Sequence, residues 1–176
     1  MKAVRKFKGE EGEDHDQKSK VAYTAGINQE GCRYRSLKLA AFQKTLKTPE
    51  VFGDPKGGDI LIVGWGSTKG AIEEAVQQMR DEGVNVSSLH LKFLQPMAMG
   101  IKEILQKYKK VICVEINYSD DMDDKLINED NRRYSNLAVL LRARYLLDVD
   151  CWSNVHGQPI KPRAIAEMIR QKLSKK

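Results

Sequence analysis

The stretch DILIVGWGSTKGAIEEAV, residues 59–76, changes its hydrophobic period at a tryptophan that stands between two glycines. Residues 59–64 are almost continuously apolar, as is typical of a strand that a parallel sheet buries on both faces. Beyond the turn, apolar side chains recur at helical spacing, at Ile72, Ala75, Val76 and Met79. The stretch therefore predicts a buried strand, a tight turn and a helix, with Ser67 or Thr68 as the N-cap.

Strand and helix patterns continue to alternate along the rest of the chain. Apolar or alternating runs predict strands at residues 84–91, 111–116 and 149–155. Helical spacing predicts helices at residues 101–108, at residues 137–147 and from Pro162 onward. We therefore expect residues 52–176 to form one α/β domain, with an open, mostly parallel sheet and helices on both faces.

Residues 1–51 lack this alternation and are predicted to form an irregular, linker-like segment. Its charged run KGEEGEDHDQKSK is broken by glycine, which is typical of loops. Helical spacing predicts a single helix at about residues 33–47. Asp14, His15 and Asp16 could be read as metal ligands. One histidine between two carboxylates, with no further ligand at a fixed spacing, favours a solvated cluster instead.

The composition is that of a globular protein, with 41% apolar and 31% charged residues. Residues 1–48 hold 11 Lys and Arg against 6 Asp and Glu, whereas residues 49–176 hold 19 against 18. Because the predicted domain is almost neutral, nucleic-acid binding is not favoured. No apolar run approaches the ~20 residues of a membrane span, and no apolar signal segment opens the sequence. We therefore expect a cytoplasmic protein with no membrane partner.

The residue types that commonly bind metals lack the necessary spacing. The cysteines, Cys32, Cys113 and Cys151, are odd in number and form no Cys-x-x-Cys pair, which disfavours a disulfide framework, a zinc site or an iron–sulfur cluster. The acidic run DDMDDKLINED, residues 120–130, lacks the spacing of a calcium-binding EF-hand loop. We expect this chain to bind no metal by itself.

Three turns, GWGSTKG, HLKFLQP and EINYSDD, follow the predicted strands at the sheet edge where ligands commonly bind. The first contains a candidate anion-binding set: Gly64, Gly66, Ser67, Thr68 and Lys69. Exposed amides at a helix N-terminus suit a phosphate, but the turn matches neither glycine-rich nucleotide motif. A structural strand-to-helix turn, with Trp65 packed over the sheet edge, is therefore favoured over anion binding.

Three polar residues, His90, Glu115 and Asn117, are candidates for the crevice at this edge, and none is a predicted catalytic residue. His90 ends an apolar strand, where a hydrogen-bonded core histidine is more common than a catalytic base. Glu115 closes a buried strand and so requires a partner or a shifted pKa. We expect that partner to be backbone amides at the strand end or a nearby base.

Four blocks in order carry a resemblance to a known family: residues 59–76, LHLKFLQP, VICVEINYS and VHGQPIKPRAIAEMI. Over roughly residues 52–173 the chain resembles the C-terminal, transketolase-C-terminal-like domain of the alpha subunit of 2-oxoacid:ferredoxin oxidoreductases, most closely the 2-oxoglutarate type. Asp14-His15-Asp16 is similar to the Glu-His-Asp that precedes this domain in the family. In the family an Asn-Tyr-Ser leads directly into a Gly-Gln-Leu-Ala helix start, whereas residues 120–133 intervene here.

The resemblance implies a reaction in which a 2-oxoacid, coenzyme A and oxidised ferredoxin give an acyl-coenzyme A, carbon dioxide and reduced ferredoxin. It implies a holoenzyme with thiamine diphosphate, magnesium and iron–sulfur clusters. The implied partners are a thiamine-binding beta subunit, the remaining alpha or gamma domains, and ferredoxin. This sequence has no Gly-Asp-Gly diphosphate motif and no cluster cysteines. We therefore expect it to act in assembly and in shaping the site, and to be inactive alone.

Two functions of other classes fit the same residues. The chain could be a free-standing α/β module that binds a nucleotide or coenzyme A at the GWGST turn, or a non-catalytic assembly protein without a small ligand.

Overall fold

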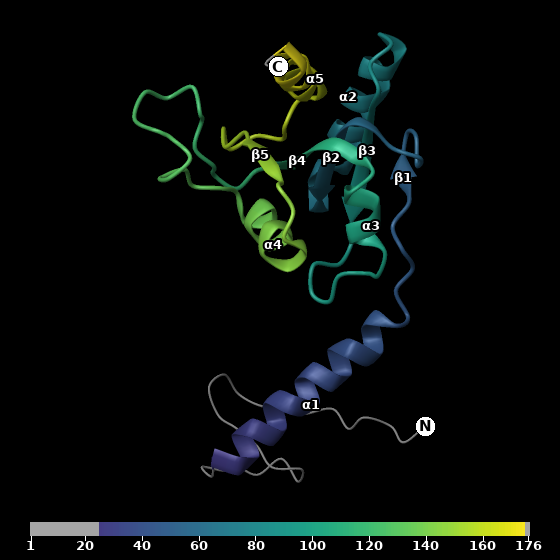
Figure 1. Cartoon of the computed structure of the whole chain (residues 1–176), viewed down its shortest axis with the longest axis vertical. Coiled ribbons are helices and arrows are strands. Elements are labelled where there is room, and N and C mark those ends of the chain that lie inside the picture. Colours follow the sequence, from purple (N-terminus) through teal and green to yellow (C-terminus); the bar gives the residue numbers. More distant parts are fainter. Residues whose placement is uncertain (1–24, 175–176) are drawn as a thin grey trace. The chain divides into compact units, whose positions relative to one another are not determined.

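The computed structural model describes residues 25–174, and the chain divides into two units between Leu46 and Lys47 (Figure 1). The described part of the first unit is the helix α1, Ala25–Gln43, and the turn that follows it. Residues 14–16, the acidic and histidine cluster of the sequence analysis, lie outside the described residues. The predicted domain boundary between residues 51 and 52 stays a prediction.

Both predicted ends of the first helix were wrong, since α1 runs over residues 25–43 and not 33–47. Gly26 and Gly31 concealed its beginning, because glycine has a low helix propensity and interrupts the pattern. At the other end, the amide and the hydroxyl of Thr45 both donate to the Phe42 carbonyl, which closes the last turn. The helix therefore ends before the apolar spacing does.

The second unit contains a five-stranded sheet with the order β1-β3-β2-β4-β5. The strands are β1 (Val51–Phe52), β2 (Gly58–Trp65), β3 (Val86–Leu91), β4 (Tyr108–Glu115) and β5 (Asp150–Ser153). Strands β2 to β5 pair in parallel, and β1 pairs antiparallel with β3. The prediction of an open, mostly parallel α/β sheet is confirmed. Strand β1 was missed, because two residues carry no detectable period.

Helices cover both faces of this sheet, as predicted. After the short 3₁₀ helix η1 (Gly66–Thr68) come α2 (Lys69–Asp81), α3 (Ile101–Leu105), α4 (Asn136–Tyr145) and α5 (Pro162–Ser174). Figure 1 shows α2 and α5 on one face and α3 and α4 on the other. Alternate residues of β2 point to the two cores: Ile60 and Ile62 pack with α2 and α5, whereas Leu61 and Val63 pack with α3 and α4.

The helix predicted at residues 101–108 is too long at its C-terminal end. Helix α3 ends at Leu105, and Tyr108, which was assigned to the helix, opens β4 instead. Tyr108 pairs with Gly58 of β2, and its hydroxyl donates to the Asp54 carbonyl, so tertiary contacts outweigh its helical spacing. The remaining ends differ from the predicted ones by a few residues, as is usual where elements fray.

The order of the strands creates a switch point between β2 and β4. From β2 the chain crosses α2 to β3 on one side, and then returns past β2 to β4 on the other side. The helices that follow β2 and β4 consequently lie on opposite faces (Figure 1). In open α/β sheets, ligands commonly bind outside the strand ends at such a point. The ends of β2 and β4 are therefore the first place to look for a site.

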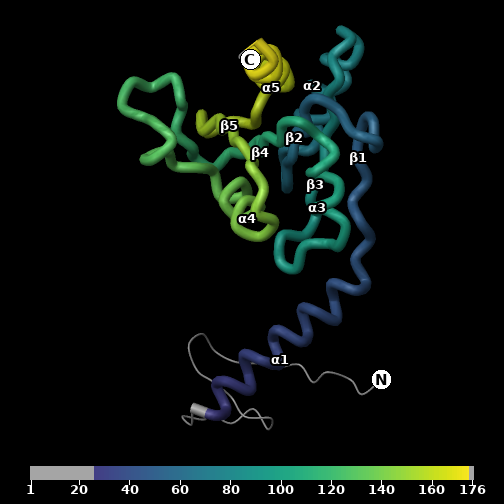
Figure 2. The backbone as a smooth tube through the Cα atoms, in the orientation of Figure 1, coloured from purple at the N-terminus to yellow at the C-terminus, as the bar shows by residue number. Residues whose placement is uncertain are grey.

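Residues 116–135, the β4–α4 connection, leave the sheet as a long loop and return to their starting point (Figure 2). Two hydrogen bonds close the base of the loop: the Asp120 amide donates to the Arg133 carbonyl at 2.9 Å, and the Arg133 amide donates to Asp120 Oδ2 at 2.7 Å. The loop that the sequence marks as an insertion therefore begins and ends at one point beside the sheet.

The same connection protects the outer edge of β5. Arg132 Nη2 donates to Asp150 Oδ1 at 2.7 Å and to the Cys151 carbonyl at 3.1 Å. The Cys151 amide donates to Asp150 Oδ1 at 2.8 Å. The Asn154 amide donates to the Glu115 carbonyl on β4. Because successive residues of a strand direct their backbone groups to alternate sides, the backbone groups of Cys151, three residues earlier, point away from β4. The outward polar groups of Cys151 are thus satisfied, which blocks sheet extension there.

Candidate functional site at the switch point

Glu115, the last residue of β4, forms the centre of the candidate site. Its side chain is 1% exposed, and its carboxylate accepts three hydrogen bonds. Oε1 accepts from the Leu137 amide at 2.8 Å, and Oε2 accepts from Asn117 Nδ2 at 2.9 Å and from Trp65 Nε1 at 3.2 Å. Three donors satisfy a buried carboxylate that would otherwise be very unfavourable. The expected partner, a backbone amide, is present, and two side-chain donors accompany it.

Glu115 also stabilises the first turn of α4. Ser135 occupies the N-cap position, but its side chain makes no capping hydrogen bond. Glu115 instead binds the amide of Leu137, in the first turn of α4, from the neighbouring strand. A negative charge near a helix N-terminus interacts favourably with the helix dipole. The contact between Glu115 and the Leu137 amide therefore stabilises the helix start. Helix α4 therefore starts correctly although the loop of residues 120–133 precedes it.

Trp65 connects the end of β2 to the same carboxylate. The residue is 38% exposed, and its indole N–H is held by Glu115 across the switch point. Trp65 was predicted to pack over the sheet edge, and its hydrogen bond to Glu115 was not predicted. A hydrogen bond to a buried acceptor fixes the ring more firmly than packing alone, because a rotation of the ring would break the bond between the indole N–H and Glu115.

The capping prediction for the GWGST turn is confirmed for the position of Thr68, but the predicted side-chain capping hydrogen bond is absent. Thr68 occupies the N-cap position of α2, but its hydroxyl makes no cap hydrogen bond. It donates instead to the Trp65 carbonyl at 2.8 Å, within the turn. Ser67 lies inside η1 and is exposed. A single 3₁₀ turn carries the chain into α2, so a hydroxyl at residue 68 faces backward and satisfies a carbonyl.

The two glycines of the turn have different roles. A Cβ on Gly64 would lie 2.2 Å from Ile72 Cδ1 and 2.8 Å from Thr68 Oγ1, so Gly64 allows α2 to cross close to β2. Gly66 has φ +61°, a left-handed conformation that a side chain disfavours, and it faces open space. Both glycines thus serve the geometry of the backbone. Lys69, the next candidate, is half-exposed and lies 3.6 Å from Glu73.

His90 does not belong to the Glu115 group. It lies on β3 beside Gly64, and the charges that act on it come first from Lys69 and Glu73 of α2, on the opposite face from α4. Its Nδ1 is buried without a hydrogen-bond partner. Burial, and next the positive charge of Lys69, lower the pKa of His90 below its ordinary value of 6.5. Burial and the charge of Lys69 thus disfavour the protonated form of His90, the form that would attract an anion.

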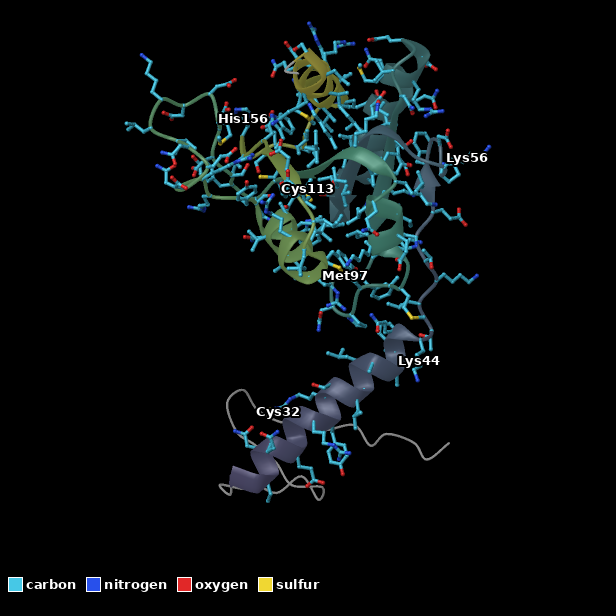
Figure 3. All side chains as sticks on the ribbon, viewed as in Figure 1. Cys32, Lys44, Lys56, Met97, Cys113 and His156 are labelled. Atoms are coloured by element: carbon cyan, nitrogen blue, oxygen red, sulfur yellow. The ribbon has the colours of Figure 1, made fainter. Side chains whose placement is uncertain are left out.

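The described residues do not fit a metal ion or an iron–sulfur cluster. Within residues 25–174, no group of three or more His, Cys, Asp or Glu could hold a metal ion. Cys113 lies on β4 in the middle of the sheet (Figure 3), and Cys151 accepts from the Ser135 amide at 3.5 Å. Cys32 is exposed on α1. We derive no chemical step through a metal or a cluster bound here.

The structure brings together Glu115 and Asn117 but places His90 and residues 66–69 with α2. The donors Trp65 and Leu137 were missed as partners of Glu115. Trp65 ends β2 and Glu115 ends the adjacent parallel strand β4, so aligning the ends of the two predicted strands would have placed them side by side. Nothing in the sequence indicated Leu137 as a partner of Glu115, because its position depends on the path of the long β4–α4 connection.

A comparison with models of protein families identifies the family of this domain. The model of the family "pyruvate:ferredoxin oxidoreductase core domain II" matches residues 58–164, which include β2, β4 and α4. The chain belongs to this family. The 2-oxoglutarate oxidoreductase subunit KorA of Mycobacterium tuberculosis is 33% identical over 122 residues, which are 69% of this chain and 16% of that protein. The 2-oxoacid:ferredoxin oxidoreductase 1 subunit alpha of Aeropyrum pernix is 40% identical over 70 residues, 38% of this chain and 11% of that protein.

A solved structure agrees with the sequence relatives. The 2-oxoglutarate:ferredoxin oxidoreductase from Magnetococcus marinus, with 2-oxoglutarate, coenzyme A and succinyl-CoA bound, matches with a TM-score of 0.72 and 25% identity. The match covers 92% of this chain and 26% of that chain. The resemblance to alpha subunits of 2-oxoacid:ferredoxin oxidoreductases is confirmed. This chain spans only a small part of the length of these relatives. Within the described residues, every helix is too short or too polar to cross a membrane.

Proposed function

We propose that the chain is a part of the alpha subunit of a 2-oxoacid:ferredoxin oxidoreductase, of the 2-oxoglutarate type. The enzyme would convert a 2-oxoacid, coenzyme A and oxidised ferredoxin into an acyl-coenzyme A, carbon dioxide and reduced ferredoxin. The observation that carries the proposal is the family match over residues 58–164, together with the 33% identity to KorA. A cytoplasmic location belongs to the same proposal.

The role proposed for this chain is structural, in assembly and in shaping the site. A general base needs a free lone pair directed at a substrate, whereas three donors already occupy the Glu115 carboxylate. Glu115 is also buried as a residue, with 1% of its surface exposed, so its carboxylate is shielded from a substrate. These contacts support Glu115 as the residue that joins β2, β4 and α4. They give no support to Glu115 as a residue that touches a substrate.

Thiamine diphosphate, magnesium and iron–sulfur clusters belong, in this proposal, to other domains or chains of the enzyme. The missing ligand group within residues 25–174 and the missing Gly-Asp-Gly motif support that division. The proposed partners are a thiamine-binding beta subunit, the remaining alpha or gamma domains and, through the complex, ferredoxin.

The test compares the isolated chain with the chain captured from its native cell. Both preparations are assayed with 2-oxoglutarate, coenzyme A and a viologen electron acceptor. We expect turnover only in the captured material, where mass spectrometry should identify thiamine-binding and cluster-bearing chains. Turnover by the isolated chain would overturn the structural role. Capture without any oxidoreductase chain would overturn the proposed membership of the complex.

A second candidate function, a free-standing module that binds coenzyme A or a nucleotide, has one observation in its favour. Gly66 faces open space at the start of η1, three residues before the cation Lys69, where α2 begins. A ligand present at 100 times its dissociation constant would stabilise the chain by ~2.7 kcal/mol. A saturable rise in melting temperature with coenzyme A that disappears in Lys69→Ala would favour this function. If coenzyme A raises the melting temperature of neither the wild-type chain nor Lys69→Ala, this second function is excluded.

A further inference from the structure

Large apolar side chains are exposed at one edge of the sheet, just beyond the ends of its parallel strands. Trp65 ends β2 and is 38% exposed, Ile116 follows β4 and is 51% exposed, and Val155 follows β5 and is 53% exposed. Phe93, after β3, is 45% exposed. Because the carboxyl ends of parallel strands meet at one edge, these four residues form what we call the apolar rim. Several large exposed apolar side chains at one edge of a sheet are typical of an interaction site.

One member of the apolar rim is held in place before any partner arrives. The Trp65 indole N–H donates to the buried Glu115 carboxylate, which the Leu137 amide and Asn117 hold in turn. A fixed aromatic side chain loses little conformational entropy on binding, and tryptophan is among the residues that contribute most to protein interfaces. The contacts of Trp65 are therefore those of a preorganised interface anchor.

The loop that begins beside the apolar rim is acidic over residues 120–130. Residues 120–130 hold six Asp and Glu and one Lys, and they start four residues after Ile116. The loop is tied to the rim side of the sheet, because Asp120 and Arg133 close its base and Arg133 stacks on Tyr118 at 5.0 Å. A partner that covers the rim meets this negative charge at its border. Charge complementarity calls for Lys and Arg on that partner.

We propose that the apolar rim is the surface on which this chain docks to the rest of the oxidoreductase, through a protein surface with an apolar centre and a basic border. The proposal rests on the proposed function. The lengths of the matching proteins indicate what covers the rim. The matched part of this chain corresponds to 16% of KorA and to 26% of the matching solved chain, so most of those polypeptides lies outside the described fold.

The first experiment measures protection of the rim. The tagged chain is labelled with hydroxyl radicals alone and in the complex captured from its native cell, and oxidation is read by mass spectrometry. We expect oxidation of Trp65 and Ile116 to fall at least about tenfold in the complex, as for side chains at a desolvated interface centre. Leu146, 86% exposed at the far end of α4, should keep its labelling rate. Equal labelling of Trp65 in both samples would overturn the proposal.

The second experiment breaks the surface without touching the Glu115 contacts. Ile116→Glu places a charge at the centre of the rim and should reduce the captured oxidoreductase chains by about tenfold or more. Val155→Glu repeats the test at another rim position in case Ile116→Glu fails to fold. The matched control is Leu146→Glu, which adds the same charge to an exposed leucine away from the rim and should capture as much as wild type. Equal capture by folded Ile116→Glu and the control would contradict the docking surface.

The acidic border is tested with the double variant Glu129→Lys/Asp130→Lys, whose two side chains are exposed. Binding should weaken, and the loss should shrink as salt is added, because salt screens exposed charges. Unchanged capture at low salt would remove the basic border from the proposal.

Two results separate the possible failures. If no oxidoreductase chain is captured, the proposed function itself is contradicted. If the full complex is captured but the rim is not protected, only the docking surface is contradicted. A dimer of the isolated chain in sedimentation, with Trp65 already protected, would assign the rim to a second copy and overturn the proposal as well.

Discussion

The ends of β2 and β4 solve the same problem in different ways. Each strand leads into a helix at the switch point, after a short turn at β2 and after a long loop at β4. At β2 the solution is local: Gly64 and Gly66 allow a close approach and a left-handed residue, and the Thr68 hydroxyl binds a carbonyl three residues back. At β4 the chain makes a long loop first, and Glu115 supplies the acceptor for α4 from the strand itself.

The difference shows where stability is concentrated at this edge of the sheet. One hydroxyl and two glycines within the turn shape the end of β2, whereas a buried charge with three donors joins β2, β4 and α4. Losing a buried acceptor leaves several donors unpaired at once, while losing the turn hydroxyl leaves one carbonyl without that donor. Substitutions at Glu115 should therefore destabilise the protein more than substitutions in the turn.

Glu115→Ala should have the largest effect. It leaves the Leu137 amide and the Trp65 indole N–H without their acceptor, and we expect a loss of about 3 kcal/mol in the free energy of unfolding. Urea denaturation monitored by tryptophan fluorescence measures it. Glu129→Ala, which removes an exposed carboxylate, is the control and should change stability by less than about 0.5 kcal/mol. Equal effects of the two would erase the contrast between the strand ends.

Gly64→Ala comes next, because the new methyl group would meet Ile72 Cδ1 at 2.2 Å. Overpacking of this kind should lower the free energy of unfolding by about 2 kcal/mol. Gly70→Ala provides a matched control in α2, where an added Cβ meets nothing within 4 Å. That variant should stabilise the protein by about 0.5 kcal/mol, since alanine favours the helix. Thermal unfolding of the pair decides, and a destabilised Gly70→Ala would count against the assigned helix start.

Thr68→Ala should have a smaller effect, about 1 kcal/mol, through the hydrogen bond that its hydroxyl donates to Trp65. Ser67→Ala should change stability by less than about 0.5 kcal/mol, as Ser67 is exposed. The comparison is made by urea denaturation. A larger loss in Ser67→Ala than in Thr68→Ala would restore Ser67 as the capping residue.

Asp150→Asn should have the smallest effect and one that depends on pH. Burial of the Asp150 carboxyl raises its pKa, but hydrogen bonds from Lys172 and Arg132 outweigh burial and hold the pKa below 3.8. A carboxylate with a lowered pKa in the folded protein stabilises it at pH values above about 3.8, and that contribution disappears as the pH falls through the folded pKa.

Stability measured between about pH 5 and pH 2 should therefore fall more steeply in wild type than in Asp150→Asn. At pH 7 the variant should lose about 0.5 kcal/mol, the scale of a partly exposed ion pair. Parallel curves for the two proteins would show that the folded protein does not favour the charged form of Asp150.

The sequence predicted most of the sheet because its central strands are continuous apolar runs. Residues 59–64 and 111–116 admit few other interpretations in a chain that alternates with helical spacing. The short β1 and the change from helix to strand at Tyr108 were not predictable in this way. Both depend on partners elsewhere in the chain, which a local period does not contain.

The candidate site was predictable only in part. Glu115 was recognisable, because a carboxylate at the end of a buried strand requires a partner. The identity of its partners depends on strand register, which brings Trp65 alongside, and on the return of the β4–α4 connection, which brings Leu137. The capping role of Thr68 was misassigned, since the direction of a hydroxyl is set by the 3₁₀ turn and not by the residue type.

The most direct test of this account is amide hydrogen exchange at Leu137, measured by NMR in wild type and in Glu115→Ala. If the Glu115 carboxylate fixes the start of α4, exchange at Leu137 should be slow in wild type and faster in the variant by at least about tenfold, the equivalent of ~1.4 kcal/mol of local protection. The amide of Val63, in the buried middle of β2, reports global unfolding and allows the overall loss of stability to be subtracted. Leu137 exchange that changes only as much as that of Val63 would contradict the account.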